Sequence, residues 1–422
     1  MDRIYNQELD ETYYRETLDN GLQVIIINKP DFLTTFAGFG AYYGALDIAQ
    51  KYEDKEYNFN PGVAHFLEHK LFENDDYKVF ESFSKMGCSV NAFTSLKETV
   101  YHFTTSNTDL EKPLNLLLDF VQNFNISKES VEKEKDIIIE EVNMYKQDVD
   151  SRLMEETLKS LYVYSPIRND IGGDNESIKK ITKEELELCY KINYHPSNMV
   201  LVVVSPIDPN KIIDIVRRNQ ATKDYKKASK PISNNKEEPL EVNRKEYSFN
   251  MDINKAKHVY GIKLKPCFKD AKECSFKEWC LYLYLKIYFS TSNPSYQEWL
   301  DKGIINDYFS FDVDFSREFA YVLFSNESDD DNLKKLVDEE LMKDLLNEEA
   351  LTLCKRKLLG ASFKVLNDVE NFGIGYMRDY LNGYDFFDNI KIIESITLDD
   401  LKEAIKNFNF SNYSLIHVYP RG

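Results

Sequence analysis

Apolar runs and helical periodicity alternate through the first part of the chain, and together they predict a mixed α and β structure. An Asn-Gly pair begins the apolar run at 21–28, so we expect a turn followed by a strand there. From residue 106 to about 145, apolar positions recur with helical spacing, and Ser127 is placed to cap the charged helix after it. The other predicted elements are strands at 36–46, 89–92 and 100–104 and helices at 62–72 and 77–86.

Two stretches, 180–206 and 395–420, repeat one order of features. Each opens with Ile-Thr and a pair of acidic residues at a helix start, passes through a turn rich in aromatic and polar residues, and ends in an apolar strand. We interpret them as two copies of one α+β unit. The lysine-rich, Pro-containing segment between them is typical of an exposed linker. The chain is therefore predicted to have domains at 1–220 and 246–422, joined by a linker at 221–245.

Composition and charge narrow the class of protein. Of 422 residues, 42% are hydrophobic and 14% aromatic, which is ample material for packed cores. The net charge of −19 argues against nucleic-acid binding, which needs a basic surface. Neither a signal-peptide stretch nor a run of eighteen apolar residues is found, so we expect no membrane span. The six scattered cysteines are expected to be reduced and mostly buried, and a cytoplasmic location follows.

The strongest chemical signal is the pentapeptide His65-Phe-Leu-Glu68-His69. Residues four apart on a helix project from one face, so the two imidazoles can approach one Zn²⁺ ion. Glu68 can reach the same side and act as the general base. The order HxxEH is the reverse of HExxH and is typical of inverzincins.

A third ligand is expected in the glutamate-rich stretch 132–145, whose Ile triplet at 137–139 predicts a helix with one buried face. Glu134 and Glu141 lie two turns apart on a common face. Glu140 points about 100° away from Glu141, so only one of these neighbours can easily be the ligand. A carboxylate ligand leaves one zinc position for water, as hydrolytic sites require.

These residues by themselves leave other interpretations open. A pair of histidines on a helix also occurs as a surface or core feature, and HxxEH strings arise by chance. A glutamate-rich helix is usually a solvated face. Asn91 has the alternative interpretation of an ordinary turn residue, and Glu134 that of a surface residue.

Further ordered motifs resemble the pitrilysin/insulinase family of zinc metallopeptidases, in its shorter, bacterial, mitochondrial-processing-peptidase-like branch. The similarity covers essentially the whole chain. It rests on five segments in the family's order and spacing: Asn20-Gly-Leu-Gln-Val, Gly62 to Glu73, Asn91-Ala-Phe-Thr94, Glu134 to Glu141 and Tyr194-His-Pro-Ser-Asn-Met199.

The resemblance implies roles for particular residues. His65, His69 and Glu141 would hold one zinc ion per chain, and Glu68 would be the catalytic general base. The family's two glutamates seven residues apart select Glu141 over Glu140. They also make Glu134 a catalytic-site residue that supports the ligands. Asn91 and Ala92 match the family's edge strand, on which an extended substrate adds by main-chain hydrogen bonds.

The family fold is α+β, with two homologous α/β-sandwich domains forming one half of a clam-shell chamber. The first domain would bind zinc and the second would be peptidase-like without a metal site. Active halves or their partners carry an Arg and, seven residues later, a Tyr that bind substrate. In this chain Trp299 and Asn306 stand at those positions. We therefore expect a heterodimer with a related, metal-free subunit that supplies Arg and Tyr, although a homodimer stays an alternative.

The function implied is that of a zinc endopeptidase acting on peptides or small unfolded polypeptides inside a chamber. The alternative is a non-catalytic scaffold or binding subunit of a processing-peptidase-like complex. Retention of His65, Glu68, His69 and Glu141 argues against that alternative.

Overall fold

A computed structural model describes residues 1–7, 9–73, 77–106, 108–226, 228–267, 270–406 and 409–421. The chain forms two compact units, each of which combines a sheet with helices. Unit 1 comprises 1–144, 169–236 and 365–382, and unit 2 comprises 145–168, 237–364 and 383–422. An α+β class is thus confirmed.

Unit 1 is built around a seven-stranded sheet in the order β1-β2-β3-β9-β4-β8-β7. Its strands are β1 (Asp2–Asn6), β2 (Glu11–Thr17), β3 (Gln23–Asn28), β4 (Thr35–Ala41), β7 (Cys88–Thr94), β8 (Thr99–Thr105) and β9 (Met199–Ser205). A small second sheet contains β5 (Ala49–Tyr52), β6 (Lys55–Asn58) and β10 (Ile232–Ser233). The helices are α1 (Val63–Phe72), α2 (Val79–Lys85), α3 (Glu111–Val121), α4 (Lys128–Gln147), α6 (Asn175–Lys180), α7 (Lys183–Asn193), α8 (Pro209–Ala221) and α13 (Val369–Asn382).

Unit 2 has a five-stranded sheet in the order β11-β15-β12-β14-β13. Its strands are β11 (Glu246–Met251), β12 (Lys257–Lys263), β13 (Ser310–Phe315), β14 (Ala320–Glu327) and β15 (Tyr413–Pro420). Its helices are α5 (Val149–Leu161), α9 (Ala271–Tyr288), α10 (Tyr296–Asp301), α11 (Leu333–Leu341), α12 (Glu348–Val365), α14 (Phe386–Ser395) and α15 (Leu398–Lys406). Short 3-10 turns lie at Pro166–Arg168 in this unit and at Pro196–Asn198 in unit 1.

The internal repeat predicted from the sequence is confirmed by the strand topology. In unit 1, β3 runs parallel to β9, and β9, β4, β8 and β7 follow as antiparallel neighbours. In unit 2, β11 runs parallel to β15, and β15, β12, β14 and β13 follow in the same way. The strands at the ends of the two repeated stretches, β9 and β15, therefore occupy equivalent places in the two sheets.

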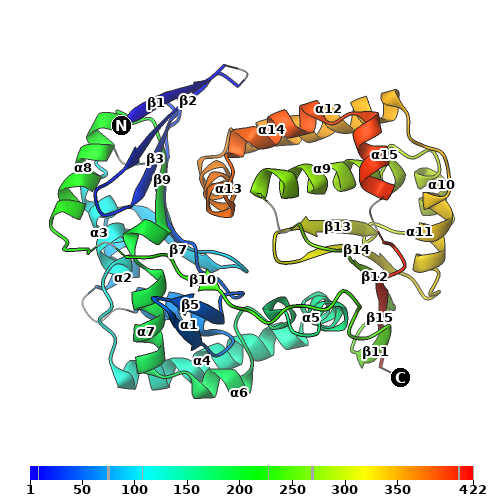
Figure 1. Cartoon of the computed structure of the whole chain (residues 1–422), viewed down its shortest axis with the longest axis horizontal. Helices are drawn as coiled ribbons and strands as arrows, with labels where there is room; N and C mark the ends of the chain where they lie inside the picture. The colour runs from blue at the N-terminus through cyan, green and yellow to red at the C-terminus, as the bar shows by residue number, and fades with distance from the viewer. Residues whose placement is uncertain are drawn as a thin grey trace. The chain divides into compact units, whose positions relative to one another are not determined.

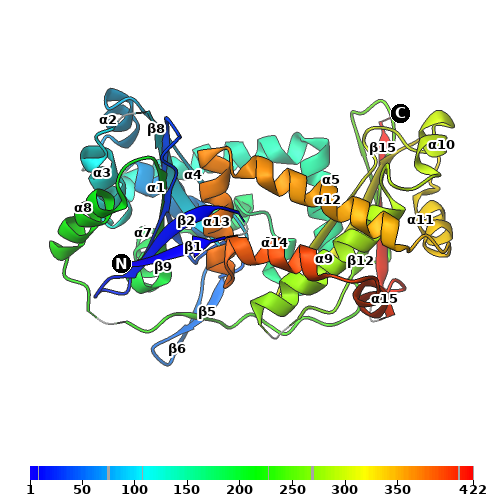
Figure 2. The same ribbon diagram turned by 90° about the horizontal axis from the view of Figure 1, so that it is seen from above.

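Two helices pack in a different compact unit from the residues next to them in the sequence. Helix α13, labelled in Figures 1 and 2, packs on β4 and β9 of unit 1, and α5 packs on β11, β12 and β15 of unit 2. Close approach of α13 to its sheet depends on Gly373, because a Cβ there would lie 2.1 Å from the Phe36 ring. The compact units are thus discontinuous in sequence. The continuous ranges 1–220 and 246–422 stay a prediction about domains.

The core of unit 1 lies between its sheet and the helices that carry the sequence motifs. It includes Phe39, Phe66, Leu67, Tyr101 and Phe103, all fully buried. Burying side chains of this size contributes roughly 1.5–3 kcal/mol each. This packing holds α1 in place, because Phe66 and Leu67 point into the core while His65 and His69 point away from it.

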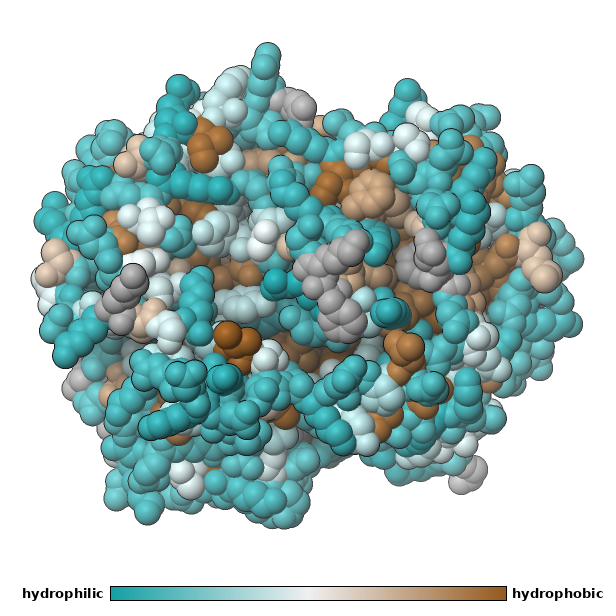
Figure 3. Space-filling view, in the orientation of Figure 1, coloured by the Kyte–Doolittle hydropathy of each residue, from teal (hydrophilic) through white to brown (hydrophobic). Residues whose placement is uncertain are grey.

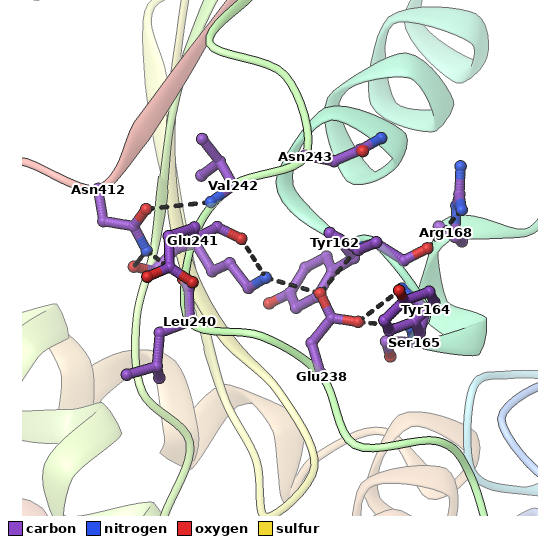
Figure 4. A network of polar contacts seen from close by, with 12 residues as sticks. Tyr162, Tyr164, Ser165, Arg168, Glu238, Leu240, Glu241, Val242, Asn243 and Asn412 are labelled. Carbon is purple, nitrogen blue, oxygen red and sulfur yellow. Dashed lines mark hydrogen bonds and ion pairs between the residues drawn. The ribbon is translucent and has the colours of Figure 1, made fainter.

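The segment after α8 is mainly irregular and exposed, as expected for a linker, but it is anchored at both ends. In unit 1, β10 pairs with β5. In unit 2, the Glu238 carboxylate accepts hydrogen bonds from three successive backbone N–H groups, Val163–Ser165, each at 2.7 Å, and from Lys263 at 2.7 Å (Figure 4).

The charges in this contact respond differently to burial. Burial alone would raise the pKa of Glu238, but Lys263 and the backbone donors outweigh it and lower the pKa. Burial also lowers the pKa of Lys263, and the carboxylate only partly counters this. The stabilisation therefore comes from the carboxylate and its four donors rather than from the ion pair alone.

Two predictions about the chain as a whole concern its cysteines and the absence of a membrane span. All six cysteines lie within the described residues, where they are buried and form no disulfide, which agrees with the prediction of reduced, mostly buried thiols. Among the described helices, none combines the length and hydropathy that are needed to cross a bilayer. The face drawn in Figure 3 is mainly hydrophilic, with apolar residues scattered over it.

Candidate metal centre

Helix α1 presents His65 and His69 on one face, as the HxxEH spacing predicts. The helix begins after Gly62, which has a φ of 89° and whose carbonyl accepts the Phe66 N–H. A Cβ at Gly62 would lie 2.3 Å from the Gly172 carbonyl oxygen, so only glycine fits this left-handed helix start. The two imidazole rings lie 4.5 Å apart between centroids.

Helix α4 brings the third group. Val131, Ile138 and Val142 are fully buried along one face, whereas Ile137 is half exposed, so only part of the Ile triplet anchors the helix. Ser127 caps the helix as predicted, since its Oγ accepts the Ser130 N–H at 3.1 Å. On this face Glu141 Oε2 lies 3.5 Å from His69 Nε2 and 3.9 Å from His65 Nε2.

The geometry of these three donors fits a zinc ion. Zinc binds nitrogen and oxygen at about 2.0–2.2 Å, so two tetrahedral ligands lie about 3.3–3.6 Å apart. The two distances from Glu141 Oε2, 3.5 Å and 3.9 Å, are close to that spacing, and all three donor atoms fall within 4.8 Å of one another. Three protein ligands leave a fourth position open, which is the arrangement of catalytic rather than structural zinc sites. Glu140 points outward and is exposed, so the structure brings Glu141 and not Glu140 to the histidines.

Glu134 and Lys70 fix the orientation of His69. Glu134 is 3% exposed, and its Oε1 lies 3.1 Å from His69 Nδ1. A carboxylate can only accept, so His69 carries its proton on Nδ1 and turns the Nε2 lone pair toward Glu141. Lys70, fully buried, donates to Glu134 Oε2 at 3.0 Å and to Glu73 Oε2 at 2.6 Å.

These contacts set the protonation of the site. Burial alone would raise the pKa of Glu134, but the hydrogen bonds from His69 and Lys70 lower it to about 2. Burial and the neighbouring His69 lower the pKa of His65 to about 3, so this imidazole is neutral and able to bind a metal. Burial acts to lower the pKa of His69, but its hydrogen bond to Glu134 and the nearby carboxylates raise it overall.

Glu68 lies beside the candidate metal ligands and is buried. The residue is 8% exposed, and Thr94 Oγ1 donates to its Oε2 at 2.8 Å. Burial raises its pKa, although Thr94 and His69 partly counter this. A carboxylate with a raised pKa is suited to accept a proton from a water molecule that a nearby metal ion would bind.

Asn91 and Ala92 lie on β7, which is the last strand of the seven-stranded sheet. The strand pairs with β8 on one side, with Ala92 opposite Tyr101. The Ala92 N–H donates to the side-chain oxygen of Asn91 at 2.9 Å. Strand β7 therefore has an outer edge without a neighbouring strand among the described residues. Its last residue, Thr94, donates the hydrogen bond to Glu68.

Comparison with known proteins identifies the family. A family model described as "Insulinase (Peptidase family M16)" matches residues 52–174, and one described as "Peptidase M16 inactive domain" matches residues 180–358. A zinc protease of Bacillus subtilis (strain 168) named YmfH, itself uncharacterized, is 37% identical over 96% of this chain and 95% of that protein. The chain belongs to the insulinase family of peptidases, family M16.

Other M16 relatives agree with this placement. A mitochondrial-processing peptidase subunit beta of Arabidopsis thaliana is 26% identical over 48% of this chain and 37% of that protein. The crystal structure of an M16-like peptidase from Alicyclobacillus acidocaldarius superposes with a TM-score of 0.92 at 30% identity, over 97% of this chain and 99% of that one. The insulinase model covers all residues of the candidate centre, from His65 to Glu141.

Sequence patterns alone did not predict a role for two residues of the candidate centre, Lys70 and Thr94. Lys70 is the only basic residue in the otherwise apolar stretch that follows His69 within α1, and a charge in such a place could have signalled a buried ion pair. Thr94 gives no comparable signal, because its contact with Glu68 depends on how β7 lies against α1.

Proposed function

We propose that the chain is a zinc-dependent endopeptidase that cleaves peptides or small unfolded polypeptides. The observation that carries the proposal is the convergence of His65 Nε2, His69 Nε2 and Glu141 Oε2 beside the buried Glu68 carboxylate. The family assignment and the zinc protease among the relatives support it.

Each residue then has a chemical task. His65, His69 and Glu141 hold one zinc ion, which when bound supplies Lewis-acid activation of water and of the scissile carbonyl. Glu68 accepts the proton of the attacking water and returns it to the leaving amine. Thr94 positions the Glu68 carboxylate, and Glu134 fixes the His69 ring so that its Nε2 faces the zinc.

Substrate is proposed to bind as an added strand along the outer edge of β7. Such binding uses main-chain hydrogen bonds and so suits peptides of many sequences. Asn91 acts as a placeholder, because its side chain holds the Ala92 N–H that a substrate carbonyl would take. Asn91→Ala is expected to leave this N–H free and lower KM, with little change in kcat.

We propose that a second, related and metal-free subunit completes the enzyme as the other half of a chamber, with a homodimer as the alternative. Trp299 and Asn306, at the positions expected for Arg and Tyr, are committed to the structure of unit 2. Trp299 is buried against Phe289, and Asn306 Nδ2 donates to the Glu327 carbonyl at 3.3 Å and to its carboxylate at 3.2 Å. Neither side chain can act as a substrate clamp without giving up these contacts.

The cytoplasm is the proposed location, since buried cysteines without disulfides suit a reducing compartment.

The test is a peptide-library digest with protein purified from its native source, with and without the captured partner. We expect cleavage by the complex, loss after chelation and recovery with Zn²⁺. Full activity of the isolated monomer would contradict the partner proposal but leave the zinc mechanism standing. Cleavage that survives complete zinc removal would contradict the mechanism itself.

The competing proposal is a scaffold or binding subunit that does no chemistry. The second half matches a model described as an inactive domain, but this match does not favour a scaffold. It covers residues 180–358 and so begins after Glu141, which leaves the candidate metal centre outside it. Zinc binding without any cleavage by the complex, over a broad peptide library, would favour the scaffold.

A further inference from the structure

Unit 2 contains a second group of metal-binding side chains. His258 on β12 and His417 on β15 are direct partners in the antiparallel register and are 1% and 2% exposed. Their Nδ1 atoms lie 2.8 Å apart. Asp331, in the segment between β14 and α11, brings its carboxylate to within 3.9 Å of His258 Nδ1 and 3.7 Å of His417 Nε2.

The hydrogen bonds define where the protons of the two rings lie. His258 Nε2 lies 2.9 Å from the Ser328 carbonyl, which can only accept, so His258 carries a proton on Nε2. A neutral His258 therefore has its lone pair on Nδ1. The 2.8 Å contact then requires His417 to carry its proton on Nδ1. The lone pair of a neutral His417 is consequently on Nε2, which faces the Asp331 carboxylate.

This arrangement places two electron-rich atoms face to face. His417 Nε2 is buried and has no hydrogen-bond partner among the described residues. A proton between it and Asp331 would give a charge-assisted hydrogen bond of about 2.7–2.9 Å. The separation of 3.7 Å is too long for that bond. It is close to the spacing of about 3.3–3.6 Å between two ligands of one tetrahedral metal ion.

We propose that His258, His417 and Asp331 form a second site for a divalent transition metal of the zinc class. Two imidazole nitrogens and one carboxylate oxygen are a donor set that suits zinc. The donor atoms of the three residues all lie within 4.8 Å of one another. Metal binding by His258 Nδ1 would use the lone pair that accepts the His417 Nδ1 proton, so this hydrogen bond would break and the His417 N–H would turn to another acceptor.

The position of the site shows which elements a metal ion would hold together, with its fourth coordination position left to water. Both histidines are on neighbouring strands of the unit 2 sheet, and Asp331 lies just before Asn332, which precedes α11. A metal ion would tie this segment to the sheet. Asp331 is 45% exposed, so the site has a route for an ion to enter from solvent. The proposal does not depend on peptidase activity, because none of these residues belongs to the centre on α1 and α4.

The test is zinc uptake by a variant that lacks the first site. In the double variant His65→Ala, Glu141→Gln we expect one tightly held equivalent of Zn²⁺ after dialysis. Adding Asp331→Asn is expected to remove that equivalent. Adding Asp330→Asn, a change to an exposed neighbouring residue, is expected to keep it. Co²⁺ as a probe should give a tetrahedral absorption spectrum that disappears only with the Asp331 change.

A stability measurement accompanies the uptake. Zn²⁺ at about a hundredfold excess over its Kd should raise the Tm of the double variant by about 5 °C, and Asp331→Asn should abolish that rise. Circular dichroism without metal checks that the exposed substitution leaves the fold intact. No zinc in the double variant, or equal uptake by the Asp330 and Asp331 variants, would overturn the proposal.

Discussion

Glu134→Gln tests how the centre on α1 and α4 is built. Glu134 touches neither the substrate edge nor the expected metal position, and it acts by accepting the Nδ1 proton of His69 at 3.1 Å. The amide that replaces it has the same shape but no charge. Its one oxygen cannot serve both His69 and Lys70, so one donor is left facing an NH₂ group.

The size of the effect follows from the lost charge. A hydrogen bond to a charged group contributes about 1.5–3 kcal/mol, and a neutral one about 0.5–1.5 kcal/mol. The difference of about 1–2 kcal/mol corresponds to roughly 5–30-fold in zinc affinity. This lies within the roughly 10–100-fold that loss of such supporting contacts usually costs. Lys70 keeps its contact with Glu73, so we expect folding to survive with a stability loss of about 1–3 kcal/mol.

Competition against a chromogenic chelator gives the zinc affinity, and thermal unfolding of the metal-free proteins separates this effect from a loss of fold. Glu132→Gln is the matched control, since Glu132 is on the same helix, is 55% exposed and, among the described residues, forms an ion pair with Lys135 alone. We expect this control to stay within about twofold of the parent because exposed ion pairs contribute little. Equal zinc affinity for the two variants would refute the proposed role of Glu134.

Three further changes probe the site and the fold. Glu141→Gln should lower zinc affinity by at least about 100-fold while Glu140→Gln leaves it unchanged, and equal losses in chelator competition would refute the choice of ligand. Gly62→Ala should lower both Tm and zinc affinity, with about 1–3 kcal/mol lost, because a Cβ meets the carbonyl 2.3 Å away; an unchanged Tm would contradict this. Glu238→Gln should cost unit 2 about 2 kcal/mol at neutral pH, measured by denaturant unfolding. The folded-state pKa of Glu238 is lowered, so its contribution to stability is present above the unfolded pKa of about 4.3 and is lost as pH falls through the folded value. Parent and variant should therefore have equal stability in acid. A stability difference that does not change with pH would refute this role of Glu238.

Local spacing predicted the parts of the centre that lie on single helices. His65 and His69 on α1, and Glu134 and Glu141 on α4, share faces because helical periodicity is fixed by the backbone. The choice of Glu141 over Glu140 came from the family pattern, since the residues alone left both open. The structure places Glu141 against both imidazoles.

Contacts between elements could not be predicted in the same way. Lys70 meets Glu134 across 64 positions and Thr94 meets Glu68 across 26, so both contacts depend on tertiary packing. The amphipathic pattern of α13 indicates that it buries one face, but not that the sheet of unit 1 is its partner. His258 and His417 are 159 positions apart, and only the strand register brings them together.

The most direct measurement of the central claim is peptide cleavage by Glu68→Gln in the zinc-loaded, partner-bound protein. We predict unchanged zinc content, because Glu68 is not one of the proposed ligands, and a fall in kcat of at least about 100-fold, because the general base is lost. A Glu68→Gln protein that holds its zinc and cleaves peptides as fast as the parent would contradict the account.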